Sequence, residues 1–203
     1  MTPVTESLDK GGVQIFKAEF NKILSFHDEV RSNFQKEISR INGKLEDSVS
    51  LSEQERVALE TRKDLYISTF EPYLKVNTFL MMVSHFEEWL FHTWKRHAPT
   101  TELLEAKGSI GRFKPVLKEV GFDLSRSKSW MFLKGCQDIR SCLLHANGRV
   151  SLNRNPEKVH NFVAQYSDVI EIEADRLVLT GRFLDYFQDA VEQLIKTGRA
   201  LKG

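Results

Sequence analysis

A helical spacing of apolar residues dominates the first part of this chain and most constrains how it can fold. Between Val13 and Ile41, apolar side chains recur at steps of three and four residues, which places them on one face of an α-helix. Similar spacing returns over 57–70, 76–94, 127–145 and 183–195. Helices with one apolar face bury it against one another, so the sequence predicts an all-α helical bundle.

Local signals set the expected ends of these helices. Asn42-Gly43 is typical of a helix stop, and the pattern Ser52-Glu53-Gln54-Glu55 is a capping box that opens the next helix. Pro72 is expected to break or kink that helix near Phe70, because proline lacks an N–H group and crowds the preceding turn.

A short alternating segment precedes the last helix. Residues 169–173 and 177–179 alternate between apolar and polar side chains, with Ala174-Asp175-Arg176 between them. This pattern predicts a small β-hairpin. The expected fold is therefore a helical bundle with one hairpin before its last helix. Its expected parts are a flexible N-terminus (1–12), an N-terminal helical extension (13–64) and a helical domain (65–203).

Several protein classes do not fit this sequence. No apolar run approaches the roughly 20 residues of a membrane-spanning helix, and residues 1–13 have no apolar stretch typical of a secretory signal. Cys136 and Cys142, six residues apart on one helix, would lie roughly 9 Å apart, too far for a disulfide. We expect reduced thiols in a cytoplasmic protein with no membrane contact.

The net charge of +1 hides an uneven distribution. Residues 107–154 hold ten basic and three acidic residues, a balance of +7, whereas the segments before and after them carry −4 and −2. A basic middle between acidic flanks indicates a local site for a polyanion. The alternative is a solvated face of flexible lysines and arginines.

Common catalytic motifs do not occur in the sequence. His85 and His92 are two helical turns apart, about 10 Å, too far to share one metal ion without other ligands. There is no H-E-x-x-H or C-x-x-C metal motif, no glycine-rich phosphate loop and no G-x-S-x-G elbow. We therefore expect neither a metal nor a cofactor.

One pair of residues stands out inside the basic segment, Arg140 and His145. The spacing alone is weak, because 13 arginines and six histidines give roughly one such match by chance. Five residues along an ideal helix leave two side chains about 140° apart. They would converge only if His145 lies in the last turn, where Asn147-Gly148 places it. The alternative is an arginine capping the helix end and a histidine bound to a carbonyl.

Such a pair suits the cleavage of a phosphodiester. Arg140 keeps its charge and can bind phosphate oxygens with two N–H groups, while His145 can transfer a proton near neutral pH. Together they fit attack of a ribose 2′-OH on the adjacent phosphate, with His145 moving the proton and Arg140 holding the developing charge.

This arrangement resembles the HEPN (higher eukaryotes and prokaryotes nucleotide-binding) domain, over roughly residues 65–200. The resemblance rests on Arg-polar-x-x-x-His at a helix end, followed by Asn-Gly, a small hairpin and a last helix. Active members of the family are metal-independent endoribonucleases, in which two Arg–His pairs meet at a dimer cleft. By resemblance, Arg140 and His145 are catalytic. Ser141 replaces the usual Asn, Asp or His, and Glu87, or else Glu88, supports the arginine.

The resemblance implies an RNA-cleaving homodimer, typical of toxins and phage-defence effectors that pair with an antitoxin or another defence protein. Lys134 and Arg149 lie near the motif and are expected to contact RNA. Two alternatives stay open. One is a non-catalytic HEPN-like module that binds RNA, nucleotide or protein in a defence complex. The other is a helical adaptor with no role in nucleic-acid binding.

Overall fold

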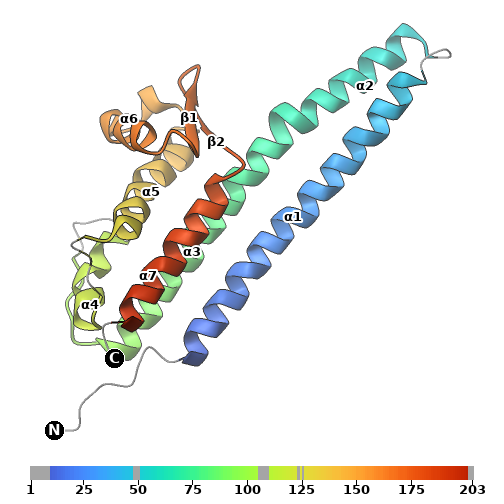
Figure 1. Cartoon of the computed structure of the whole chain (residues 1–203). Helices are drawn as coiled ribbons and strands as arrows, with labels where there is room; N and C mark the ends of the chain where they lie inside the picture. The colour runs from blue at the N-terminus through green and yellow to red at the C-terminus, as the bar shows by residue number, and fades with distance from the viewer. Residues whose placement is uncertain (1–9, 48–50, 105–109, 123, 125, 201–203) are drawn as a thin grey trace.

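A computed structural model of the chain describes residues 10–47, 51–104, 110–122, 124 and 126–200. Most of them are helical, and an antiparallel hairpin precedes the last helix (Figure 1), which confirms the predicted fold class. The helices and strands are α1 (Lys10–Glu46), α2 (Glu53–Leu65), α3 (Glu71–His97), α4 (Lys114–Glu119), α5 (Lys128–His145), α6 (Pro156–Gln165), β1 (Ile170–Glu173), β2 (Arg176–Leu179) and α7 (Phe183–Ala200).

The N-terminal helical segment shares the main core of the protein. Of the N-terminus predicted to be flexible, residues 1–9 lie outside the described residues, while 10–12 already belong to α1. Val13, Phe16 and Phe20 of α1 are all buried in the same apolar cluster as α3, α5 and α7. The first turns of α1 are therefore part of the bundle.

The predicted end of the first helix at Asn42-Gly43 is wrong, because α1 runs on to Glu46. Ile41 is fully buried and Leu45, one turn later, is half-buried. The backbone N–H of Asp47 donates to the carbonyl of Gly43 at 3.1 Å. Packing of this further turn overrides the local stop signal.

The capping box at the start of α2 forms as predicted. The backbone N–H of Ser52 donates to Oε2 of Glu55 at 2.9 Å, and the N–H of Glu55 donates to Oγ of Ser52 at 3.3 Å. These two bonds satisfy N–H groups that have no partner within the first helical turn.

Pro72 was expected to break or kink the helix, and it does not break it. A π-helical turn, η2 (Tyr66–Phe70), joins α2 to α3, and Pro72 follows at the start of α3. A proline crowds the carbonyl four residues earlier, and the wider π turn accommodates this crowding while the chain stays helical. Residues 53–97 thus form one continuous helical rod (Figure 1).

The far ends of α1 and α2 form a two-helix arm, made of residues 30–46 and 53–65, that projects from the bundle (Figure 1). No residue of α2 is buried. At the base of the arm the ring of Phe34 lies 5.5 Å from that of Tyr66 and 6.0 Å from that of Phe70, measured between centroids.

Helix α3 runs through the centre of the bundle. The ring of Phe79 meets Phe183 and Phe187 of α7 edge-on, at centroid distances of 5.1 and 5.5 Å. On another side of α3, Trp89 lies 5.5 Å from Phe16 of α1. Across the described ranges, no helix has the length and apolar character needed to span a membrane.

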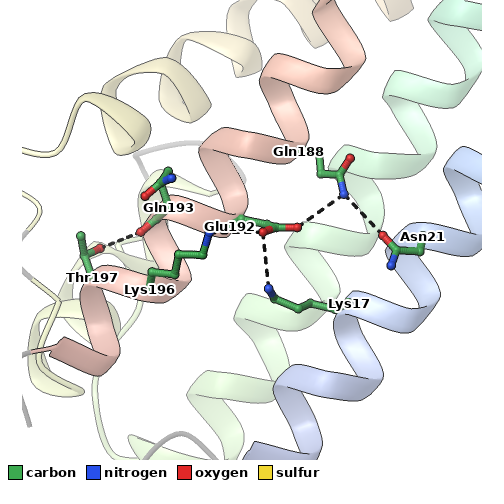
Figure 2. A network of polar contacts seen from close by, with 7 residues as sticks. All are labelled: Lys17, Asn21, Gln188, Glu192, Gln193, Lys196 and Thr197. Atoms are coloured by element: carbon green, nitrogen blue, oxygen red, sulfur yellow. Dashed lines mark hydrogen bonds and ion pairs between the residues drawn. The ribbon is translucent and has the colours of Figure 1, made fainter.

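Polar contacts join α1 to α7 at the edge of this core (Figure 2). Nζ of Lys17 lies 3.4 Å from Oε2 of Glu192, and the amide of Gln188 donates to Oδ1 of Asn21 at 3.4 Å. These contacts connect the first helix of the chain with the last one.

Helix α5 packs closely against α6 through a glycine. A Cβ atom at Gly135 would lie 2.3 Å from Cδ2 of Phe162, so only glycine fits there without a shift. The Phe162 ring in turn lies 5.5 Å from the ring of Phe132 on α5. This close approach fixes α5, the helix that carries the candidate motif.

Candidate functional site

The candidate motif lies at the C-terminal end of α5. The helix starts after Ser127, whose hydroxyl accepts the backbone N–H of Trp130 at 3.1 Å. It ends at His145, so the histidine lies in the last turn as predicted. Trp130, Leu133 and Cys136 are buried, as their spacing predicts.

Leu144 does not lie on this inner face of α5. Leu144 is 47% exposed to solvent. Leu144 follows Cys136 by eight residues, which places it about 80° around the helix from that buried thiol. Its neighbour Leu143 packs against the core instead. A large apolar side chain therefore faces solvent beside the candidate histidine.

Three predicted site residues share the outer side of α5. Lys134, Ser141 and His145 are separated by seven and four residues, so they lie near one line along the helix. Lys134 and His145 are exposed, and Ser141 is half-buried. Asp138 lies between Lys134 and Ser141 on the same side.

Arg140 leaves the helix in a different direction from His145. The last turn stays α-helical, because the N–H of Ala146 donates to the carbonyl of Cys142 at 3.0 Å. The two side chains therefore remain about 140° apart on α5. Arg140 is half-buried, and its Nε is buried with no hydrogen-bond partner among the described residues. The two side chains therefore leave α5 from different sides of the helix.

Glu87 of α3, the expected support for the arginine, also has a buried polar atom without a partner among the described residues. Its Oε1 is buried and, within the described part of the chain, accepts no hydrogen bond. The other candidate, Glu88, points elsewhere. Its carboxylate lies 3.8 Å from Nδ1 of His85 and 3.7 Å from Nε2 of His92. Of the two glutamates, Glu87 has the free acceptor that a supporting residue needs.

The chain leaves α5 through a left-handed turn. Asn147 and Gly148 have φ angles of 49° and 74°. Asparagine tolerates this region better than most residues, and glycine adopts it freely. The N–H of Gly148 donates to the carbonyl of Cys142 at 3.0 Å. The Asn-Gly dipeptide thus reverses the chain directly after His145.

The segment after this turn pairs with the hairpin. The N–H of Leu177 donates to the carbonyl of Gly148 at 2.9 Å, and the N–H of Val150 donates to the carbonyl of Asp175 at 2.8 Å. Arg149 and Arg176 are directly opposite each other in this antiparallel bridge. The helix end with His145 is therefore attached to β2, 31 residues later in the sequence.

The tip of the hairpin contacts the segment that follows α5. Ala174 and Asp175 form the two-residue turn with φ angles of 44° and 71°, as in a type I′ turn. The carboxylate of Asp175 accepts hydrogen bonds from the hydroxyl and the N–H of Ser151. These bonds, with smaller effects of the charges of Arg149 and His160, lower the pKa of Asp175.

Three residues of this region had no site role predicted from the sequence. Ser151, Asp175 and Arg176 all hold or adjoin the segment that follows His145. Aspartate in a two-residue turn was the available signal for the hairpin tip. Nothing in the sequence indicates that residues 147–151 pair with the hairpin, because this contact depends on the packing of α5 against α6 and α7.

The two cysteines of α5 belong to the core. Burial raises the pKa of the Cys136 thiol well above its usual range, and burial together with the charge of Asp175 raises that of Cys142 to about 11. Thiols with such pKa values are protonated and poor nucleophiles at neutral pH.

Within the described residues, no three His, Cys, Asp or Glu side chains lie close enough to hold a metal ion. Arg149, like Lys134, is exposed.

No family model, curated protein or solved structure matches this chain.

Proposed function

We propose that this chain is a metal-independent endoribonuclease of the HEPN type that acts as a toxin or phage-defence effector. The observation that carries the proposal is the pair Arg140 and His145 on one helix. The histidine is exposed at the last residue of α5, and the arginine keeps a buried Nε without a partner among the described residues. Unpaired buried polar atoms are rare and call for an explanation.

The chemistry follows from the two side chains. His145 removes the proton from a ribose 2′-OH, whose oxygen attacks the adjacent phosphorus while the bond to the 5′ oxygen breaks. The 5′ oxygen takes up a proton, and a 2′,3′-cyclic phosphate remains. Arg140 stabilises the negative charge that develops on the phosphate oxygens. We propose that Glu87, whose Oε1 is free to accept a hydrogen bond, positions Arg140, although no hydrogen bond or ion pair joins the two within the described residues.

A homodimer supports this chemistry better than one subunit. Because Arg140 and His145 diverge by about 140°, they do not face one phosphate from the same helix. A two-fold axis beside α5 brings the arginine of one subunit toward the histidine of the other, and closed two-fold dimers are the commonest oligomers. The exposed side chain of Leu144, next to His145 at the end of α5, offers apolar area for such an interface.

Exposed basic residues near the motif support RNA as the substrate. Lys134 lies on the same side of α5 as His145, and Arg149 follows the helix end. Binding that depends on phosphate contacts weakens as salt rises, because releasing counterions into a more concentrated salt solution gains less entropy. Changing either residue to glutamine should reduce the salt slope by up to about one.

The test is cleavage of a broad pool of single-stranded RNA by the purified protein in EDTA. We expect products that end in a 2′,3′-cyclic phosphate. His145→Ala should abolish them without changing the circular dichroism, because His145 is exposed. His92→Ala, which removes an exposed histidine of α3, is the matched control and should stay active. An inert wild type would reject the nuclease proposal.

The second candidate function is a non-catalytic module that binds RNA, nucleotide or a partner protein within a defence complex. The divergence of Arg140 and His145 favours it, as does Ser141, which stands at the position where the family usually has Asn, Asp or His. This candidate predicts salt-dependent RNA binding or partner binding without cleavage in the same assay.

A further inference from the structure

Arg149 and Arg176 form an unusual like-charge pair beside the candidate site. The bonds from Val150 to Asp175 and from Leu177 to Gly148 flank their bridge. This pattern makes the two arginines a non-hydrogen-bonded pair, the cross-strand position in which side chains come closest. Like charges directly opposite each other destabilise a sheet.

Neither arginine forms an ion pair within the described residues, and both are exposed. Nη1 of Arg176 donates to the backbone carbonyl of Asn147 at 3.1 Å. Glu173, its partner on β1, makes no ion pair with it in the described part of the chain. The carboxylate of Asp175 already accepts two bonds from Ser151, which together with the charge of Arg149 lower its pKa, and it forms no ion pair with either arginine. The arginine pair therefore keeps a free capacity for an anion.

The position of the pair suggests which anion it binds. Asn147, which holds the Arg176 guanidinium, is two residues after His145, so the pair adjoins the end of α5. A guanidinium group binds phosphate oxygens through two parallel N–H groups. Two guanidinium groups opposite each other in this bridge can bind one phosphate from both sides, which relieves their mutual repulsion.

We propose that Arg149 and Arg176 together bind one backbone phosphate of a single-stranded RNA, next to the phosphate that is cut. The inference deepens the proposed nuclease function and rests on it for the choice of RNA as ligand. It assigns a role to Arg176, which sequence reasoning missed, and to the pairing of residues 147–151 with β2. Because the hydrogen bonds between Ser151 and Asp175 hold that pairing, they also keep the backbones of the two arginines side by side.

The test measures binding rather than cleavage. A fluorescent single-stranded RNA of 2′-O-methyl nucleotides, which lacks the attacking hydroxyl, is titrated with the full chain at low salt. We expect Arg149→Gln and Arg176→Gln each to weaken binding by about tenfold, the loss typical of a charged hydrogen bond. Arg56→Gln, an equal charge change on α2 in the arm (Figure 1), should have little effect.

The double variant shows whether the two arginines share one phosphate. If they do, the loss in the double variant is smaller than the product of the single losses, because neighbouring groups on one ligand are coupled. Independent losses would overturn the shared site, as would single variants that bind like Arg56→Gln. Arg176→Lys keeps the charge and a donor for Asn147, and we expect intermediate binding.

Cleavage of unmodified RNA separates this inference from the nuclease proposal. If the pair binds the modified RNA but unmodified RNA stays intact, the nuclease function fails and the phosphate site stands. If the wild type cuts RNA while both single variants bind and cut as Arg56→Gln does, the phosphate site fails and the nuclease function stands. A wild type that does not bind the modified RNA also rejects the phosphate site.

Discussion

Ser151 donates two hydrogen bonds to the carboxylate of Asp175, one from its N–H at 2.9 Å and one from its hydroxyl at 2.5 Å. The two residues are 24 positions apart, one in the segment after α5 and the other at the hairpin tip. Their contact closes the pairing that begins with Gly148 and Leu177. The segment that follows the candidate histidine is thereby held by the hairpin.

The first prediction concerns the pH dependence of this contact. Hydrogen bonds from Ser151 lower the pKa of Asp175, so the folded state prefers the carboxylate. The stabilisation is fully present above the ordinary pKa of aspartate, about 3.9, and is lost as pH falls through the lower folded value. Asp175→Asn should therefore reduce the free energy of unfolding at neutral pH and match the wild type in strong acid.

Urea unfolding at a series of pH values measures this difference. Asp189→Asn, at an exposed position of α7, is the control and should behave like the wild type throughout. A difference between wild type and Asp175→Asn that stays constant from neutral pH to pH 2 would contradict an ionised carboxylate in this contact.

The second prediction concerns assembly. If Arg140 and His145 act across a two-fold axis, a mixed dimer of Arg140→Ala and His145→Ala subunits retains one complete pair. Mixing the two inactive variants should then restore part of the RNA cleavage. Light scattering at the assay concentration gives the oligomeric state of each preparation. A fully active monomer would reject the composite site while leaving both residues as catalytic candidates.

The third prediction concerns the packing of α5 on α6. Gly135→Ala places a methyl group against the Phe162 ring, and overpacking of this kind typically costs about 1–3 kcal/mol. Gly43→Ala is the matched control on α1, where nothing lies within 4 Å of the new Cβ. It should instead raise the free energy of unfolding by about 0.5–1 kcal/mol, because alanine favours the helix. Denaturant unfolding of both variants gives the comparison.

The fourth prediction concerns a buried histidine of α1. Burial lowers the pKa of His27, whose Nδ1 lies 2.9 Å from Oγ1 of Thr78 on α3. As pH falls below about 6.5, the ordinary value for histidine, the unfolded chain binds a proton more readily than the folded one. The free energy of unfolding should therefore decrease from pH 7 to pH 5.

His27→Gln should remove much of that slope, whereas His92→Gln, at an exposed position, should retain it. The slopes come from denaturant unfolding at closely spaced pH values. Equal slopes for wild type and His27→Gln would show that other groups carry the pH dependence.

The helical elements follow from apolar spacing and from local caps. Ser52 and Ser127 cap their helices through their own side chains, so these starts are visible in a few neighbouring residues. The hairpin was predictable for the same reason, because alternation is a local signal, although its turn is one residue shorter than the expected Ala174-Asp175-Arg176. The differences fall where packing decides and where the backbone adopts a rare kind of turn. The buried side chain of Ile41 extends α1 past Gly43, and the π turn before Pro72 keeps α2 and α3 continuous.

The candidate site was predictable only in part. The position of His145 follows from the helix stop at Asn147, which is local. The direction of Arg140 relative to His145 follows from the regular last turn of α5, where a looser geometry was expected. The bridge between Arg149 and Arg176 joins segments that no sequence pattern connects. Such long-range pairs are set by how α5 packs against α6 and α7.

The two-helix arm has a consequence for local unfolding. No side chain of α2 is buried, and segments with little buried apolar area open at a lower free energy than the core around them. Amide hydrogens of α2 should therefore exchange with solvent long before those of α3, although both lie on one rod. Helix α2 can unfold locally while the bundle around the buried Phe79 and Phe86 stays folded. One end of the rod therefore belongs to the cooperative core, and the other end lies outside it.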